Sequence, residues 1–60
     1  MIKVTKLNGD SIYVNSDLIE FVESVPDTMI TLTTGKKIII KETADFVVER
    51  VIDYRRKLVE

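Results

Sequence analysis

The chain has 60 residues, of which 32% are charged, and its formal net charge is −1. It contains no Cys and no His, which excludes disulfides, thiolate metal sites and the most common general base. The near balance of acidic and basic residues gives no overall field that would attract nucleic acid or an anionic membrane. We therefore expect one small domain over residues 1–60, without cofactor or metal.

The apolar residues come in short runs, the longest being Ile38–Ile40 and Phe46–Val48. A membrane-spanning helix needs about 20 apolar residues, and a secretory signal needs an apolar stretch of about 7–15. We therefore expect no transmembrane segment and a cytoplasmic location.

Two strands are predicted near residues 2–7 and 11–15, where apolar and polar side chains alternate. Asn8-Gly9 lies between them and predicts a type I′ hairpin turn, because both residues tolerate the positive φ that this turn requires. Four apolar side chains are expected on the core-facing side of this hairpin: Ile2, Val4, Ile12 and Val14.

The chain should turn again at residues 15–17, since Asn, Ser and Asp side chains readily bond to their own backbone. A third strand is predicted near residues 19–25. It should end near Pro26-Asp27, because Pro lacks the amide donor that pairing needs.

A second hairpin is predicted from strands near residues 29–34 and 37–41, turned at Gly35. Thr43 is a good helix N-cap, and apolar residues then recur at helical spacing over residues 44–58. The expected fold is α+β: a small antiparallel β-meander of about five short strands with one C-terminal amphipathic α-helix.

The helix carries more apolar surface than one sheet can cover. Its first apolar stripe consists of Val47, Val51, Tyr54 and Leu58, and a second lies roughly 100° further round. That second stripe consists of Val48, Ile52 and Val59, and Arg55 lies between the two. Five further apolar residues are expected on the strand faces opposite the core: Leu7, Tyr13, Val22, Met29 and Ile39.

This excess favours burial by another chain over scattered surface exposure, because association supplies the burial that so short a chain lacks. We therefore predict a homo-oligomer or a docking module. Arg55 either extends to water near the helix end or pairs with a carboxylate of another chain. The candidate interface residues are Val48, Ile52, Arg55, Val59, Tyr13, Met29 and Ile39.

No catalytic arrangement is evident from the residue pattern. The serines have no adjacent base, and Glu20 and Glu23 are an odd number of residues apart, which should direct them to opposite faces of a strand. The basic residues Lys36, Lys37 and Lys41 form a candidate patch. Lysines at a sheet edge also prevent unwanted strand pairing, and that explanation is favoured here.

Five segments together form a specific combination of motifs that covers nearly the whole chain. They are L-N-G at residues 7–9, N-S-D-L-I-E at 15–20, the stretch ending in P-D-T at 23–28, T-L-T-T-G-K-K at 31–37, and V-E-R-V-I-D-Y-R-R at 48–56. As a set they closely resemble the FlbD/SwrD family of bacterial flagellar and swarming-motility proteins.

The resemblance implies a cytoplasmic accessory role in swarming and flagellar motor output, with the cytoplasmic face of the flagellar basal body as a possible site of action. It supplies no catalytic residues. The conspicuous family positions match residues that are first of all turn formers: Asn8, Gly9, Pro26, Asp27, Gly35 and Lys36. The expected partners are a second copy of the chain and an unidentified motility protein.

Two other readings stay open. The stretch from Leu18 to Val51 also resembles part of a LytTR-type DNA-binding domain, in which Lys36, Lys37 and Lys41 would contact nucleic acid. Alternatively, the wide apolar helix with its basic last turn would lie on a membrane surface as a peripheral adaptor.

Overall fold

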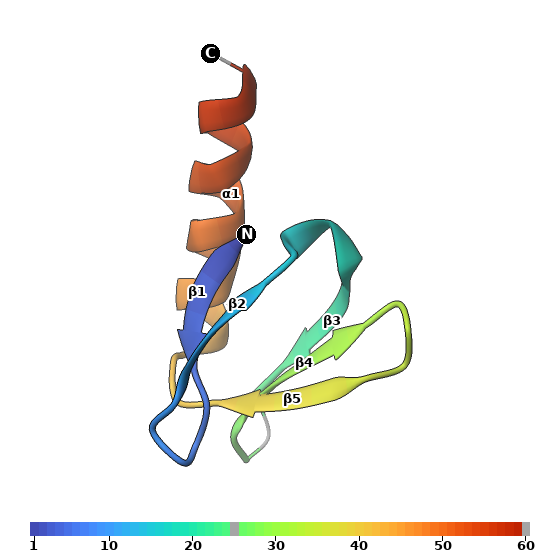
Figure 1. Cartoon of the computed structure of the whole chain (residues 1–60), viewed down its shortest axis with the longest axis vertical. Helices are drawn as coiled ribbons and strands as arrows, with labels where there is room; N and C mark the ends of the chain where they lie inside the picture. Colours follow the sequence, from blue (N-terminus) through green and yellow to red (C-terminus); the bar gives the residue numbers. More distant parts are fainter. Residues whose placement is uncertain (25, 60) are drawn as a thin grey trace.

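The computed structural model describes residues 1–24 and 26–59, with side-chain surroundings described as far as Lys57. Over these residues, five antiparallel strands form two sheets and one α-helix follows them (Figure 1), which confirms the predicted α+β class. The elements are β1 (Ile2–Thr5), β2 (Ser11–Val14), the 3-10 turn η1 (Ser16–Leu18), β3 (Ile19–Glu23), β4 (Thr28–Leu32), β5 (Lys37–Ile40) and α1 (Ala44–Val59). The predicted end of the third strand at residue 25 lies outside the described residues.

The strands divide into two sheets because η1 redirects the chain after β2. Asn15 caps this turn, its side-chain oxygen accepting a hydrogen bond of 3.1 Å from the Asp17 N–H. β2 therefore pairs only with β1, while β3, β4 and β5 form the second sheet. One bridge between Lys6 and Ile40 connects the two sheets.

In the two predicted hairpins, hydrogen bonds between Lys6 and Asp10 and between Leu32 and Lys36 extend the pairing beyond the strands and leave loops of three residues, 7–9 and 33–35. The predicted type I′ turn at Asn8-Gly9 is therefore wrong. Among the described residues, positive φ occurs only at Gly9 (95°) and Gly35 (91°), whereas a type I′ turn also needs it at Asn8. The Gly9 N–H donates to the Lys6 carbonyl at 2.9 Å, and the Lys6 N–H donates to the Asp10 carbonyl at 2.8 Å. Asn8 instead accepts a hydrogen bond from the Asp10 N–H through its side chain.

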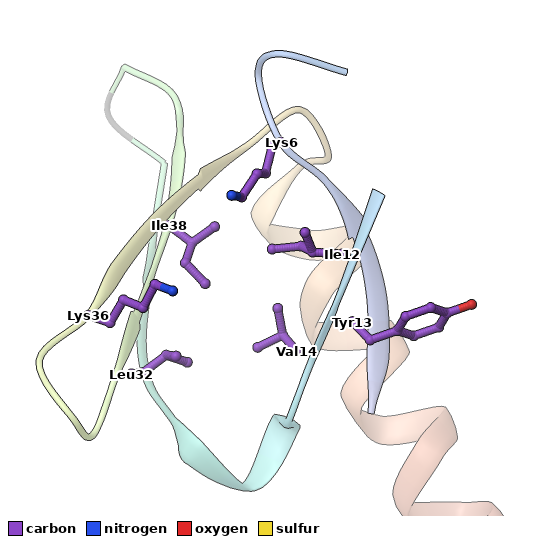
Figure 2. Close-up of a pocket in the computed structure, with 7 residues that line it drawn as sticks. All are labelled: Lys6, Ile12, Tyr13, Val14, Leu32, Lys36 and Ile38. Carbon is purple, nitrogen blue, oxygen red and sulfur yellow. The ribbon is translucent and has the colours of Figure 1, made fainter. Parts of the chain in front are cut away.

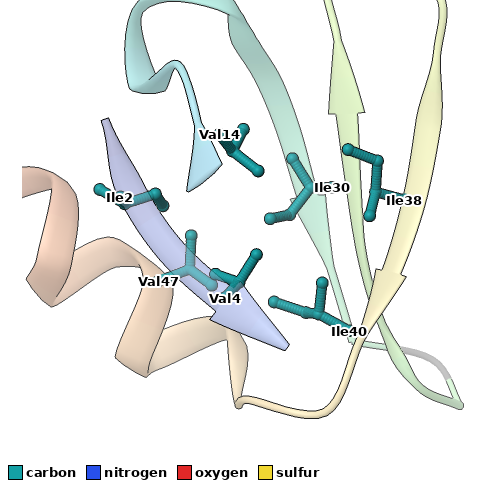
Figure 3. Close-up of a cluster of buried hydrophobic side chains, with 7 residues drawn as sticks. All are labelled: Ile2, Val4, Val14, Ile30, Ile38, Ile40 and Val47. Atoms are coloured by element: carbon teal, nitrogen blue, oxygen red, sulfur yellow. The ribbon is translucent and has the colours of Figure 1, made fainter. Parts of the chain in front are cut away.

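The core lies between the two sheets and the first turns of α1 (Figure 3). Its helix contribution is Val47, which is fully buried. Thr43 caps the helix as predicted, with its Oγ1 accepting a hydrogen bond of 3.1 Å from the Phe46 N–H. The buried apolar residues are Ile2, Val4, Val14, Ile30, Ile38, Ile40 and Val47.

A register shift in β3 changes which side chains face the core. The pairing with β4 slips between Ile19 and Phe21, so Ile19 and Val22 both pack against the core although they are three residues apart. The prediction that Val22 faces away is therefore wrong, and Phe21 is exposed in its place. Because the shift interrupts the alternation of side chains, an odd spacing no longer implies that Glu20 and Glu23 lie on opposite faces of β3. Both side chains are exposed.

Candidate functional site

The two apolar stripes of α1 have different surroundings. In the first stripe Val47 is buried, and Val51 and Tyr54 are half-buried. In the second stripe Val48 is 49% exposed and Ile52 is 46% exposed. The sheets therefore cover one stripe and leave the other, called the outer stripe below, in contact with solvent; the predicted members Leu58 and Val59 lie outside the described side chains.

An apolar groove runs beside the outer stripe, between α1 and β3, and is called the α1–β3 groove below. Its volume is about 200 Å³. Apolar side chains from both elements form most of its walls, and Arg55 and Ser16 supply its polar groups. The lining residues are Ser16, Ile19, Val22, Val47, Val48, Val51, Ile52 and Arg55.

The two polar residues of the groove, Ser16 and Arg55, have different surroundings. Ser16 is only 3% exposed, and its Oγ has no hydrogen-bond partner. A buried hydroxyl left in this state costs about 1–3 kcal/mol. Arg55 adds guanidinium donors beside the apolar walls.

The C-terminal half of α1 extends beyond the two sheets (Figure 1). The helix has 16 residues and is therefore about 24 Å long. Its charges are unevenly distributed: two acidic residues and one basic residue give the first half a net charge of −1, and one acidic and three basic residues give the second half a net charge of +2. The first-half residues are Asp45, Glu49 and Arg50, and the second-half residues are Asp53, Arg55, Arg56 and Lys57. All seven of these side chains are exposed.

The remaining candidate interface residues lie elsewhere. Met29 and Ile39 are cross-strand partners in the second sheet, where Ile39 is 44% exposed and Met29 is partly buried. Tyr13 is exposed on β2 and lines a separate hollow with Asp53 and Tyr54. The structure therefore brings together Val48, Ile52 and Arg55, but does not join the other three to them.

The candidate basic residues are also separated. Lys37 begins β5 and Lys41 follows its end, roughly 13 Å away at the rise of an extended strand. Lys36 instead lines a cavity of about 280 Å³ between the sheets, opposite Lys6 (Figure 2). The floor of this cavity is apolar and includes Ile12, Val14, Leu32 and Ile38, while the Tyr13 ring points away from it.

Sequence reasoning missed three features of these surfaces. Lys6 and Lys36 line the same cavity only because the chain after β1 approaches β5, which no local pattern indicates. Phe21 is exposed only because of the β3 register shift. Ser16 was assigned to a turn, and its side-chain environment depends on the packing of α1 against β3.

One carboxylate has a clear structural role. Glu42 accepts hydrogen bonds from the Thr5 N–H (2.8 Å) and the Thr5 Oγ1 (2.9 Å), which ties β1 to the segment between β5 and α1. Burial acts to raise the pKa of Glu42, but these bonds, its own backbone N–H and the charge of Lys41 outweigh it, so the pKa is lowered.

The described residues contain no group of three or more Asp or Glu side chains arranged to hold a metal ion. Within the same part of the chain, no helix combines the length and apolar character needed to cross a membrane. The predicted turn residues Pro26 and Asp27 lie in the connection between β3 and β4. Around α1 the surface presents an apolar stripe, a groove with a buried hydroxyl, and flanking charges.

Residues 1–59 match the sequence model of the FlbD family, described as flagellar and swarming motility proteins. No curated protein and no solved structure matches the chain.

Proposed function

Because the chain belongs to the FlbD family of flagellar and swarming motility proteins, we propose that it supports motility by protein contact and catalyses no reaction. The contact surface is the outer stripe of α1 together with the α1–β3 groove. The first occupant of this surface is a second copy of the chain, and the assembled form acts on a motility protein at the cytoplasmic side of the flagellar base.

The observation that carries this proposal is the exposure of Val48 and Ile52 next to an apolar groove. Complete burial of a Val or Ile side chain contributes about 1.5–3 kcal/mol. Since both residues are about half exposed, burying them contributes roughly 1 kcal/mol each, or roughly 4 kcal/mol for two chains.

That contribution has to be compared with the cost of association. The loss of translational and rotational freedom alone costs about 4–15 kcal/mol. The outer stripe by itself therefore does not hold two chains together, and the groove has to be filled as well. We expect a reversible oligomer whose formation depends on concentration.

The test compares two isoleucines of nearly equal exposure, Ile52 in the outer stripe and Ile39 on the second sheet. Each is replaced by Lys, and circular dichroism first checks that both variants fold. We expect light scattering to give a mass of at least two chains for the wild type and for Ile39→Lys, and one chain for Ile52→Lys.

The same variants are then expressed in a motile strain that lacks the native gene. We expect Ile39→Lys to restore swarming and Ile52→Lys to fail at equal protein level. Full swarming with a folded Ile52→Lys variant would show that the outer stripe is not the working surface.

A further inference from the structure

We infer that the second copy packs its α1 antiparallel against α1, with Ile52 at the two-fold axis and Glu49 of each chain opposite Arg56 of the other. This inference rests on the proposed function, because it specifies how the self-association surface is occupied.

The arrangement follows from helix geometry. At 100° per residue, Val48 lies about 40° to one side of Ile52, while Arg56 lies about 40° and Glu49 about 60° to the other side. Along the axis, Glu49 lies about 4.5 Å before Ile52 and Arg56 about 6 Å after it. Glu49 and Arg56 therefore flank the outer stripe on the same side, and both line a shallow hollow beside Ile52.

Consider a two-fold axis that passes through the Ile52 contact and is perpendicular to both helices. It places each residue of the partner at the opposite height along the helix axis but on the same flank of the interface. Arg56 of the partner then lies about 6 Å before Ile52, on the flank that Glu49 occupies. Along the helix axis, this Arg56 and Glu49 are within about 1.5 Å of each other. Two identical pairs of opposite charge then form, one on each side of the axis.

The parallel alternative fails on charge. In a parallel pair the two-fold axis runs along the helices, so each residue of the partner keeps its height but lies on the opposite flank of the interface. Arg56 of one chain would then lie next to Arg55 of the other. Like charges at that distance repel, and the acidic halves of the helices would also lie side by side. The antiparallel arrangement instead places each acidic half against a basic half.

The shape of the molecule agrees with this arrangement. The C-terminal half of α1 extends beyond its own sheets (Figure 1). In the antiparallel pair, the first half of the partner helix lies alongside this projecting half. On the flank away from Glu49, the partner meets the α1–β3 groove, where the exposed guanidinium of Arg55 is available for polar contacts.

The helix dipole alone favours acidic residues in the first turn and basic residues in the last turn. It does not account for Glu49, which lies in the second turn, or for the apolar residues between the two charged groups. Self-complementary pairing accounts for the acidic residue, the apolar centre and the basic residue together.

The test reverses each charge separately, in Glu49→Arg and Arg56→Glu. Each variant alone brings like charges together twice, and we expect the dimer dissociation constant to rise roughly tenfold or more at low salt. When the two variants are mixed in equal amounts, the mixed dimer has two attractive pairs, so the mixture should regain most of the lost affinity. The double variant Glu49→Arg/Arg56→Glu should also associate.

The matched control is Lys57→Glu, which makes the same type of charge change as Arg56→Glu one residue further along. Lys57 lies about 140° round the helix from Ile52 and lines the hollow that contains Tyr13 instead. Sedimentation equilibrium should therefore give this variant an affinity near that of the wild type.

The outcomes separate the two ideas. If the single variants dissociate and their mixture does not recover, the antiparallel pairing is overturned, while self-association through the outer stripe stands. The pairing is also overturned if Glu49→Arg and Arg56→Glu associate as strongly as the wild type. A wild-type chain that stays monomeric at all concentrations would overturn both ideas.

Discussion

The connection between the two sheets depends on a few polar contacts, and Glu42 provides two of them. Apart from the Lys6–Ile40 bridge, the Lys41 N–H donates to the Thr5 carbonyl at 2.9 Å, and the Glu42 carboxylate accepts from both donors of Thr5. We expect Glu42→Gln to lower the free energy of unfolding, because the neutral amide keeps one acceptor oxygen where the carboxylate uses two.

The size of the effect follows from the bonds that change. Hydrogen bonds to a charged group contribute about 1.5–3 kcal/mol, and neutral ones about 0.5–1.5 kcal/mol. Losing one charged bond and weakening the other should cost about 1–2 kcal/mol in all, since the group is partly open to solvent. For a chain of this size that corresponds to a melting temperature lower by about 5–15 °C.

The lowered pKa of Glu42 also predicts how stability depends on pH. In the unfolded chain this carboxyl should titrate near its ordinary value of 4.5, and in the folded protein below it. Between these two pKa values the unfolded state binds more protons, so stability falls as the pH decreases. The contribution is fully present above pH 4.5 and is lost as the pH falls through the folded-state pKa.

Urea unfolding of the wild type and Glu42→Gln at neutral pH, and then at steps below pH 4.5, measures both effects. Glu20→Gln is the control, because Glu20 is exposed. The two curves for wild type and Glu42→Gln should converge in acid. Equal stability at neutral pH, or a constant difference at every pH, would refute the role given to Glu42.

Three further predictions concern the core, a turn and the basic residues. Val47→Ala should cost about 2 kcal/mol of unfolding free energy, because Val47 is buried. The neighbouring Val48 is exposed, so Val48→Ala should cost no more than about 0.5 kcal/mol in dilute solution. Equal losses in urea unfolding would contradict the assignment of the two stripes. Gly35→Ala should lower the free energy of unfolding by about 1–2 kcal/mol. The cause is the φ of 91° alone, since no atom lies within 4 Å of the added Cβ. The adjacent Thr34→Ala should be nearly neutral in thermal melts. Fluorescence anisotropy with duplex DNA should show no binding that falls steeply between about 50 and 200 mM salt, because Lys36, Lys37 and Lys41 do not form one patch; such a salt dependence would instead support the nucleic-acid reading.

Features that depend on neighbouring residues were predictable. The Thr43 cap acts over three residues, and the hydrogen bond to the Phe46 N–H confirms it. The shared face of the first hairpin is also confirmed, because Ile2 pairs with Val14 and Val4 pairs with Ile12. Side-chain alternation over a few residues contains all the information that these assignments need.

The candidate surface was predictable only in part. Helical spacing alone identifies Val48 and Ile52 as a second apolar stripe with Arg55 beside it. Spacing does not show that β3 lies next to this stripe and forms a groove with it, or that Ser16 is buried there. It also placed Val22 on the wrong face, because a register shift inserts one residue into the alternation and the sequence carries no mark of it.

The sequence by itself determined the strands, the turn positions, the helix with its cap and the presence of two apolar stripes, because these depend on backbone geometry and side chains only a few residues apart. The tertiary structure alone decided how the strands divide into two sheets and which stripe is covered. It also decided that the Glu42 carboxylate accepts hydrogen bonds from Thr5, 37 positions away. Those outcomes depend on contacts between distant segments, whose geometry is set by the packing of the whole chain.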